Sequence, residues 1–174
     1  FFALEPPDPV RNQGHAIQRG FEGDGRAVKP EQFHVTLAFL GMQPSQVIPE
    51  LCSIASTLVF TPCTVTLDRL GRFRRAGVLW LGASVIPDAL KDFQQSLIEA
   101  IESGGIDRDR KEWRFHLTLY RRLRNPPPIM ETVAVDWPLD GFSLIESVSV
   151  NNGVKYHRRG HWKSGSSGIQ PGFV

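Results

Sequence analysis

The sequence predicts an α+β fold of two similar lobes, in which two antiparallel sheets face a central cleft and the helices lie outside. The main observation is a repeat: a strand, a helix that opens with Pro-Asp, a loop and a His-x-Thr-x strand occur twice. Pro7–Asp8 is matched by Pro87–Asp88, and His34–Leu37 by His116–Leu119, each about 80 residues later. Offsets that agree this well indicate an internal duplication.

Length and composition favour one soluble domain. The chain has 174 residues, of which 41% are hydrophobic and 22% charged, and no apolar run approaches the roughly 18 residues of a membrane span. Because no basic segment precedes the apolar residues Phe1–Leu4, we do not expect them to form a signal peptide. We expect a two-lobed domain over residues 1–163 and a flexible Ser/Gly-rich tail over residues 164–174.

Two cysteines, Cys52 and Cys63, form neither a C-x-x-C pair nor a metal-ligand cluster. Reduced thiols are typical of a cytoplasmic protein, which is the location we expect. We also expect a monomer that contacts no membrane.

Three helices follow from apolar residues at helical spacing. The first has Asp8 as its N-cap and Pro9 at its first position, and it runs to about Gln18. The other two are predicted from about residue 44 to residue 58 and from residue 87 to about residue 101.

Seven strands are expected where apolar and β-branched residues cluster or alternate. They cover residues 1–5, 33–40, 64–70, 78–83, 113–120, 142–151 and 154–157. A basic turn spans residues 72–76, Pro126–Pro128 breaks the chain, and Asn152–Gly153 is typical of a tight hairpin turn.

The repeated tetrapeptide places polar side chains on one face of each strand. Because side chains alternate along a strand, His34 and Thr36 point the same way, and so do His116 and Thr118. A single His-x-Thr-x is more often an ordinary part of a sheet than a catalytic site. Two copies at matching positions favour a paired catalytic site at the interface of the lobes.

Such a group of residues suits cleavage of a phosphodiester. Histidine titrates near neutral pH, so one imidazole can accept a proton while the other donates one. The two threonine hydroxyls can donate hydrogen bonds to the phosphate oxygens. Because these groups can balance the charge themselves, we expect no metal and no cofactor.

Other features are open to two interpretations. Basic residues form three groups along the chain, in residues 69–75, 108–124 and 155–163, which either converge on a polyanion or belong to a solvated surface. Tyr156 and Trp162 either stack on bases or close the edge of a sheet. His157 and His161 have a ligand spacing that would require a helix, and the surrounding strand pattern argues against one.

Longer strings of the sequence resemble the 2H phosphoesterases, and within them the RNA 2',3'-cyclic phosphodiesterase branch, also called 2'-5' RNA ligase. The strings are Phe1–Leu4, His34–Gly41, Val78–Gly82 and His116–Leu119, and the resemblance extends over about residues 1–163. It implies opening of a 2',3'-cyclic phosphate to a 2'-phosphate, with His34 as acid toward O3' and His116 as base toward water. The partners implied are RNA 3' ends or small cyclic nucleotides.

The resemblance also implies that an aromatic residue after the first motif, Phe39, contacts the base, and that Arg121 after the second motif holds phosphate. On regular strands both side chains would point away from the cleft, and only a bulge or a strand end would turn them back. Tyr120 has the correct parity and is the substitute. Packing in the core is an equally good interpretation of Phe39.

Two other functions use the same residues. One is 2'-5' RNA ligation, in which a 5'-hydroxyl replaces water. The other is a nucleotide- or RNA-binding module that has no useful turnover, although two His and two Thr weigh against it.

Overall fold

The computed structural model describes residues 1–21, 24–124, 133–151 and 153–165, and its α+β class with antiparallel sheets confirms the predicted fold class. The Pro126–Pro128 break, Asn152 of the hairpin turn and most of the expected tail lie outside the described residues. No helix among the described residues is long and apolar enough to cross a membrane.

The three α-helices are α1 (Asp8–Arg19), α2 (Ile48–Ser56) and α3 (Asp88–Ser103), and the short 3₁₀ helices are Pro30–Gln32, Ser45–Val47 and Arg74–Ala76. The strands are β1 (Phe2–Leu4), β2 (Arg26–Ala27), β3 (Val35–Ala38), β4 (Cys63–Leu67), β5 (Arg69–Phe73), β6 (Val78–Gly82), β7 (His116–Arg121), β8 (Val135–Leu139), β9 (Gly141–Val150) and β10 (Gly153–Lys163).

The larger sheet has the order β10-β9-β1-β3-β7-β6-β5, with β2 added to β7, and all its pairings are antiparallel. It is symmetric about its centre, because β1-α1-β3 and β6-α3-β7 are the two copies of one strand-helix-strand unit. The copies meet through one register pair, Val35 with Leu117. The sheets of the two predicted lobes are therefore joined edge to edge at this single pair.

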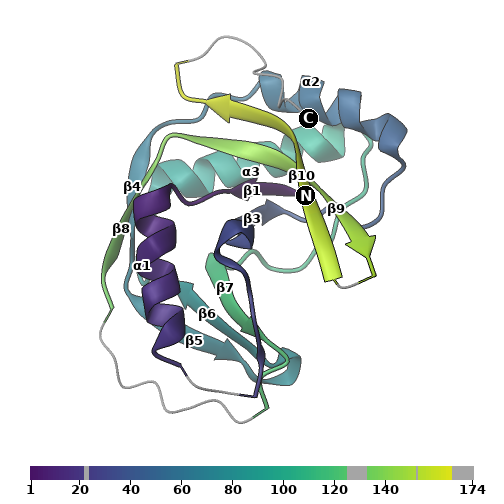
Figure 1. Cartoon of the computed structure of the whole chain (residues 1–174). Coiled ribbons are helices and arrows are strands. Elements are labelled where there is room, and N and C mark those ends of the chain that lie inside the picture. The colour runs from purple at the N-terminus through teal and green to yellow at the C-terminus, as the bar shows by residue number, and fades with distance from the viewer. Residues whose placement is uncertain (22–23, 125–132, 152, 166–174) are drawn as a thin grey trace.

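Each copy's helix packs against the central strand of the other copy. Helix α1 precedes β3 in the chain but contacts β7 and β8, whereas α3 precedes β7 but contacts β3 (Figure 1). Helix α2 packs on α3 and β10. The exchange of helices ties the two lobes into one body.

The start of α1 differs from the prediction. The N-cap is Pro7, and Asp8 is the first helical residue, so the expected capping role of Asp8 is wrong. Its carboxylate accepts a hydrogen bond from Arg11 one turn later. A carboxylate in the first turn still interacts favourably with the positive end of the helix dipole.

A second, two-stranded sheet of β4 and β8 was only half predicted. The pattern of residues 64–70 indicated one strand, but Asp68 interrupts it and β4 and β5 belong to different sheets. Strand β8 was not predicted, although Val135, Trp137 and Leu139 alternate with exposed residues as in a half-buried strand. Trp137 is 1% exposed and packs against Phe115, which joins this small sheet to the core.

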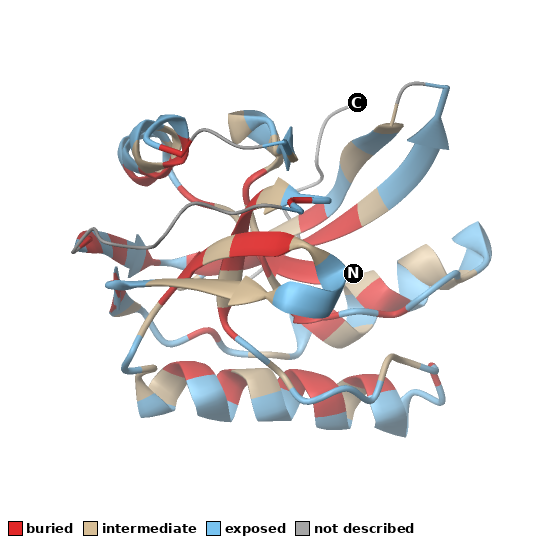
Figure 2. Ribbon diagram, turned by 90° about the horizontal axis from the view of Figure 1, so that it is seen from below, coloured by how far each residue is buried: buried red, intermediate tan, exposed pale blue. Residues whose placement is uncertain are grey.

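Buried residues lie on the inward sides of the helices and through the centre of the sheet (Figure 2). Trp162 belongs to this core: it stacks on Phe142, and its indole N–H donates to the Ser56 hydroxyl at 3.0 Å. Of the two interpretations of Trp162, base stacking is therefore excluded by its burial.

The β5–β6 pair generates a test of this packing. Gly71 lies directly opposite Trp80, and a Cβ at Gly71 would overlap the indole ring. We predict that Gly71→Ala lowers the free energy of unfolding by about 1–3 kcal/mol, measured by urea denaturation. Gly14→Ala is the control, because its Cβ would meet Phe33 at 3.5 Å, an ordinary contact, and helix propensity would raise stability by roughly 0.5–1 kcal/mol. Equal effects of the two substitutions would contradict this packing.

Candidate active site

The β3–β7 contact brings the two His-x-Thr-x motifs together. Extending the antiparallel Val35–Leu117 register by one residue each way puts His34 opposite Thr118 and Thr36 opposite His116. Val35 and Leu117 are buried on one face, so the four polar side chains share the other face. They form a group with local twofold symmetry, in which the histidines are diagonal neighbours, about 7–8 Å apart in such a pair.

Each imidazole is held by an equivalent hydrogen bond to a backbone carbonyl. Nδ1 of His34 lies 2.7 Å from the carbonyl oxygen of Gln32, and Nδ1 of His116 lies 2.7 Å from that of Arg114. A carbonyl only accepts, so each Nδ1 carries a proton and donates it. Nε2 is therefore the atom of each ring that can accept or donate a proton in the site.

Aromatic rings fix the orientation of the imidazoles, and they differ between the two sides. His34 packs against Phe1 and Tyr156, with ring centroids at 5.0 and 5.3 Å, and these two rings also contact each other at 5.5 Å. His116 has one such neighbour, the Phe73 ring at 5.0 Å in an edge-on contact. His116 is consequently the more open of the two imidazoles.

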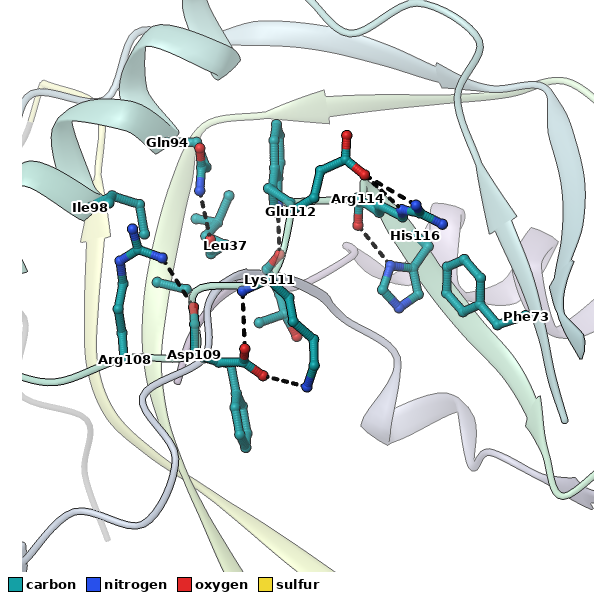
Figure 3. A pocket seen from close by; sticks show the side chains of 14 residues that line it. Leu37, Phe73, Gln94, Ile98, Arg108, Asp109, Lys111, Glu112, Arg114 and His116 are labelled. Atoms are coloured by element: carbon teal, nitrogen blue, oxygen red, sulfur yellow. Dashed lines mark hydrogen bonds and ion pairs between the residues drawn. The ribbon is translucent and has the colours of Figure 1, made fainter. Parts of the chain in front are cut away.

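His116 and Thr36 border a cavity of about 520 Å³, which we call the apolar cavity (Figure 3). Its walls include the aromatic residues Phe39, Phe73 and Trp113. The indole N–H of Trp113 donates to the Thr36 carbonyl at 2.9 Å, which holds this ring beside the strand. Charged groups at the rim are already paired, as Lys111 is with Asp109 and Arg114 with Glu112.

His34 and Thr118 border a different cavity, of about 410 Å³, which we call the basic cavity. Its cationic lining consists of Arg26, Lys29, Arg121 and Arg122, and none of the described residues that line it is acidic. The four motif side chains thus stand between an apolar cavity on one side and a cationic cavity on the other.

A bulge in β7 decides the direction of Arg121. Trp80 pairs with Thr118 but Leu79 pairs with Tyr120, so Leu119 is an extra residue and the alternation of faces reverses after it. Arg121 therefore lines the basic cavity with His34 and Thr118. Tyr120 turns to the opposite face, where its hydroxyl donates to the carbonyls of Phe21 and Gln18, and the expectation that it substitutes at the site is wrong.

Phe39 is turned back by a strand end. Strand β3 stops at Ala38, and Phe39 is 50% exposed and lines the apolar cavity together with Thr36 and His116. Its position is that of a side chain available to a ligand, and packing in the core does not describe it.

The pKa values of both histidines lie below the ordinary value of 6.5. Burial is the largest cause of the lowered pKa of His34, and the positive charges of Arg121 and His116 add to it; the Gln32 hydrogen bond and Glu5 act in the opposite direction. Burial is also the largest cause of the lowered pKa of His116, and the positive charges of Arg121 and Arg114 add to it. The hydrogen bond to the Arg114 carbonyl acts in the opposite direction and raises this pKa. An anion bound between the histidines would raise both values.

Sequence reasoning did not assign Phe73, Trp113 or the Gln32 and Arg114 carbonyls to the site. For Tyr156 the two interpretations stayed open, and the structure brings it against His34. The carbonyls carried one usable signal, since each lies two residues before its histidine in the same repeat.

The remaining histidine pair does not line the apolar or the basic cavity. His157 and His161 are on β10, as the strand pattern indicated, and Nδ1 of His161 lies 2.9 Å from the Ser143 hydroxyl. Among the described residues no group of three or more His, Cys, Asp or Glu side chains could hold a metal ion.

A profile of the 2'-5' RNA ligase superfamily matches residues 6–151, which is most of the chain and includes both motifs. The chain belongs to this superfamily. The resemblance of its motifs to the 2H phosphoesterases is thereby confirmed.

Several relatives are named RNA 2',3'-cyclic phosphodiesterase, including proteins of Escherichia coli and Thermus thermophilus. The Escherichia coli protein is 31% identical over 134 residues, covering 74% of this chain and 76% of that protein. The Thermus thermophilus protein is 28% identical over 172 residues, covering 90% of this chain and 85% of that protein. Among solved structures, E. coli LigT complexed with 3'-AMP aligns with a TM-score of 0.83 and 25% identity, covering 95% of this chain and 97% of LigT.

The electrostatics of the site generate a prediction that needs no substrate. We expect His34 and His116 to titrate with pKa values below 6.5 in an NMR pH titration. Arg121→Gln should raise both values, because it removes a positive charge that disfavours each imidazolium. Tyr120→Phe is the adjacent control and should leave them unchanged, since its hydroxyl lies on the other face. Histidines that titrate above 6.5 in the unmodified chain would contradict the described geometry.

Proposed function

We propose that this chain hydrolyses 2',3'-cyclic phosphates at RNA ends, or in nucleotides, to 2'-phosphates without a metal. The observation that carries the proposal is the twofold pair of imidazoles, each with its Nδ1 bonded to a carbonyl and its Nε2 left for proton transfer. The names of the relatives support the choice of a cyclic phosphate as the substrate.

The proposed reaction is an in-line displacement at phosphorus. Nε2 of a neutral imidazole takes a proton from water, and the water oxygen bonds to phosphorus as the P–O3' bond breaks. Nε2 of the imidazolium on the opposite side gives its proton to O3'. The product is a 2'-phosphate with a free 3'-hydroxyl, and the only other reactant is water.

Three further groups would stabilise the phosphate while negative charge builds on its oxygens. The Thr36 and Thr118 hydroxyls are opposite His116 and His34 in the strand register, so they flank the position between the imidazoles. Arg121 supplies a positive charge from the rim of the basic cavity. Hydrogen-bond donors fixed in advance around the phosphate would lower the barrier by stabilising charge in the transition state.

We assign the acid to His34 and the base to His116, as the family resemblance implies. The more open setting of His116, with one aromatic neighbour against two for His34, supports the approach of water on its side. Phe39, at the edge of the apolar cavity, is the proposed contact for the base of the substrate.

Both histidines come from one chain, so one copy forms the complete site. We therefore propose that the protein acts as a monomer, in the cytoplasm, where RNA ends are available.

Removal of either imidazole tests the proposal. With a short RNA ending in a 2',3'-cyclic phosphate and EDTA present, His34→Ala and His116→Ala should each lower kcat by about 10²–10⁴-fold. Binding of the 2'-phosphate product, measured by calorimetry, should be largely kept. His157→Ala is the matched control on β10 and should retain normal turnover.

The phosphate position of the product completes this test. A 3'-phosphate product would indicate that the substrate binds in the reverse orientation, with O2' as the leaving group. Joined RNA strands would indicate ligation. If neither alanine variant loses activity, the catalytic assignment is wrong.

The pH dependence follows from the lowered pKa values. The form with one neutral and one charged imidazole is most abundant midway between the two pKa values, so kcat/KM should be bell-shaped with its optimum below pH 6.5. The bound phosphate anion raises both pKa values, and the optimum of kcat should therefore lie at higher pH than that of kcat/KM. A kcat/KM that only rises with pH would exclude an acid among the two histidines.

A further inference from the structure

A third cavity, of about 270 Å³, lies beside the proposed active site and has a cationic lining. It is formed by Arg72, Arg74 and Arg124 together with Phe73, Gly77, Val78 and Leu123. None of these described lining residues is acidic. The carboxylate of Asp24 accepts a hydrogen bond from the backbone N–H of Arg124 at 2.9 Å. We call it the arginine cavity.

Two segments connect the arginine cavity to the histidines. Phe73 lines it and also lines the apolar cavity, where its ring contacts His116. Residues 121–124 run from the basic cavity, which Arg121 and Arg122 line, to the arginine cavity, which Leu123 and Arg124 line. A chain of phosphates could thus pass from the histidines to these arginines without leaving the cationic surface.

The backbone around the arginine cavity is closely fitted and strained. Arg122 has φ of 59°, a left-handed conformation that costs a non-glycine residue energy and turns the chain between the two cavities. Gly77, at φ 59°, lets the β5–β6 turn approach, since a Cβ there would lie 3.0 Å from both N and O of Leu123. The Leu123 N–H donates to the Gly77 carbonyl at 2.9 Å and so joins the segment after β7 to the β5–β6 turn.

The third basic group lies on β10, and most of its residues form ion pairs. Arg158, Arg159 and Lys163 of the third basic group each pair with an acid on neighbouring strands or loops: Glu5, Glu146 and Asp140. The third group is thus part of an ion-paired surface. The first and second basic groups, in contrast, contribute arginines to the linings of the arginine cavity and the basic cavity.

We propose that the arginine cavity binds a phosphodiester on the 5' side of the cyclic phosphate. The inference rests on the proposed function, because a cyclic phosphate ends the strand and every other phosphate of the substrate lies on its 5' side. Guanidinium groups suit this ligand, since they remain charged and donate in pairs to phosphate oxygens. The enzyme should then act better on an oligonucleotide than on a mononucleotide.

The test compares a trinucleotide that ends in a 2',3'-cyclic phosphate with a nucleoside 2',3'-cyclic phosphate. The variant is the double substitution Arg74→Gln/Arg124→Gln. It should lower kcat/KM for the trinucleotide by about tenfold or more and leave that for the mononucleotide unchanged. Unchanged mononucleotide turnover also shows that the variant is folded.

A matched control has the same change in charge, and both of its residues lie in β5 or the turn that follows it. Arg69→Gln/Arg75→Gln removes two exposed arginines of β5 and its following turn that do not line the cavity. This control should keep the preference for the trinucleotide. Equal losses in both double variants would indicate only the overall charge of the protein and would overturn the inference, as would no loss in either.

A binding measurement separates this inference from the proposed reaction. Affinity for the product trinucleotide is measured by calorimetry at several salt concentrations. The dependence of log K on log salt should become shallower by roughly 0.7 for each arginine–phosphate ion pair that Arg74→Gln/Arg124→Gln removes. If the unmodified chain turns over neither substrate, the proposed function fails while this arm still decides the cavity. An unchanged slope overturns the subsite.

Discussion

The antiparallel contact between Val35 and Leu117 determines where the two histidines and the two threonines of the proposed reaction stand. Within the described part of the chain it is the only register pair between β3 and β7, and both side chains are almost fully buried. Because a local twofold axis passes through an antiparallel pair, the residue on either side of it is repeated by symmetry. One buried apolar contact therefore sets the separation of the two imidazoles and the position of both threonine hydroxyls.

The exchange of helices protects this contact. Helix α1 packs on β7 and α3 packs on β3, so the lobes cannot separate without exposing the faces of both helices. Residues buried in α3 include Leu90, Phe93 and Leu97. Burial of such side chains contributes roughly 1.5–3 kcal/mol each, which is large compared with the net contribution of a single hydrogen bond. The position of the imidazoles therefore depends mainly on apolar packing.

The backbone contacts of the two histidines are symmetric, whereas the side chains around them are not. Both histidines donate from Nδ1 to the carbonyl two residues earlier, as expected for two copies of one unit. Their neighbours are unrelated, since the Phe1 and Tyr156 rings contact one imidazole and Phe73 contacts the other. Duplication thus supplies two equivalent proton-transfer groups, and divergence around them gives each side a different cavity.

Much of the fold and the grouping of the motif residues could be predicted, because periodicity and a repeat are local signals. The bulge at Leu119 could not be predicted, since it depends on how β6 pairs with β7. This bulge reverses the faces to which the Tyr120 and Arg121 side chains point. The strand at Val135–Leu139 was missed because its alternation is short. The sequence did not indicate which basic residues form ion pairs or which line a cavity, because the groups around them are distant in sequence.

The two Nδ1–carbonyl bonds also determine the condition of the protein after each cycle. They prevent either ring from changing tautomer, so a proton enters or leaves only through Nε2. In the proposed reaction the imidazole that began charged ends neutral, and the one that began neutral ends charged. The protein therefore finishes in a state that matches the reverse step, and it regains its starting state only by exchanging protons with the solvent. The surrounding water and buffer therefore take part in every cycle together with the fold.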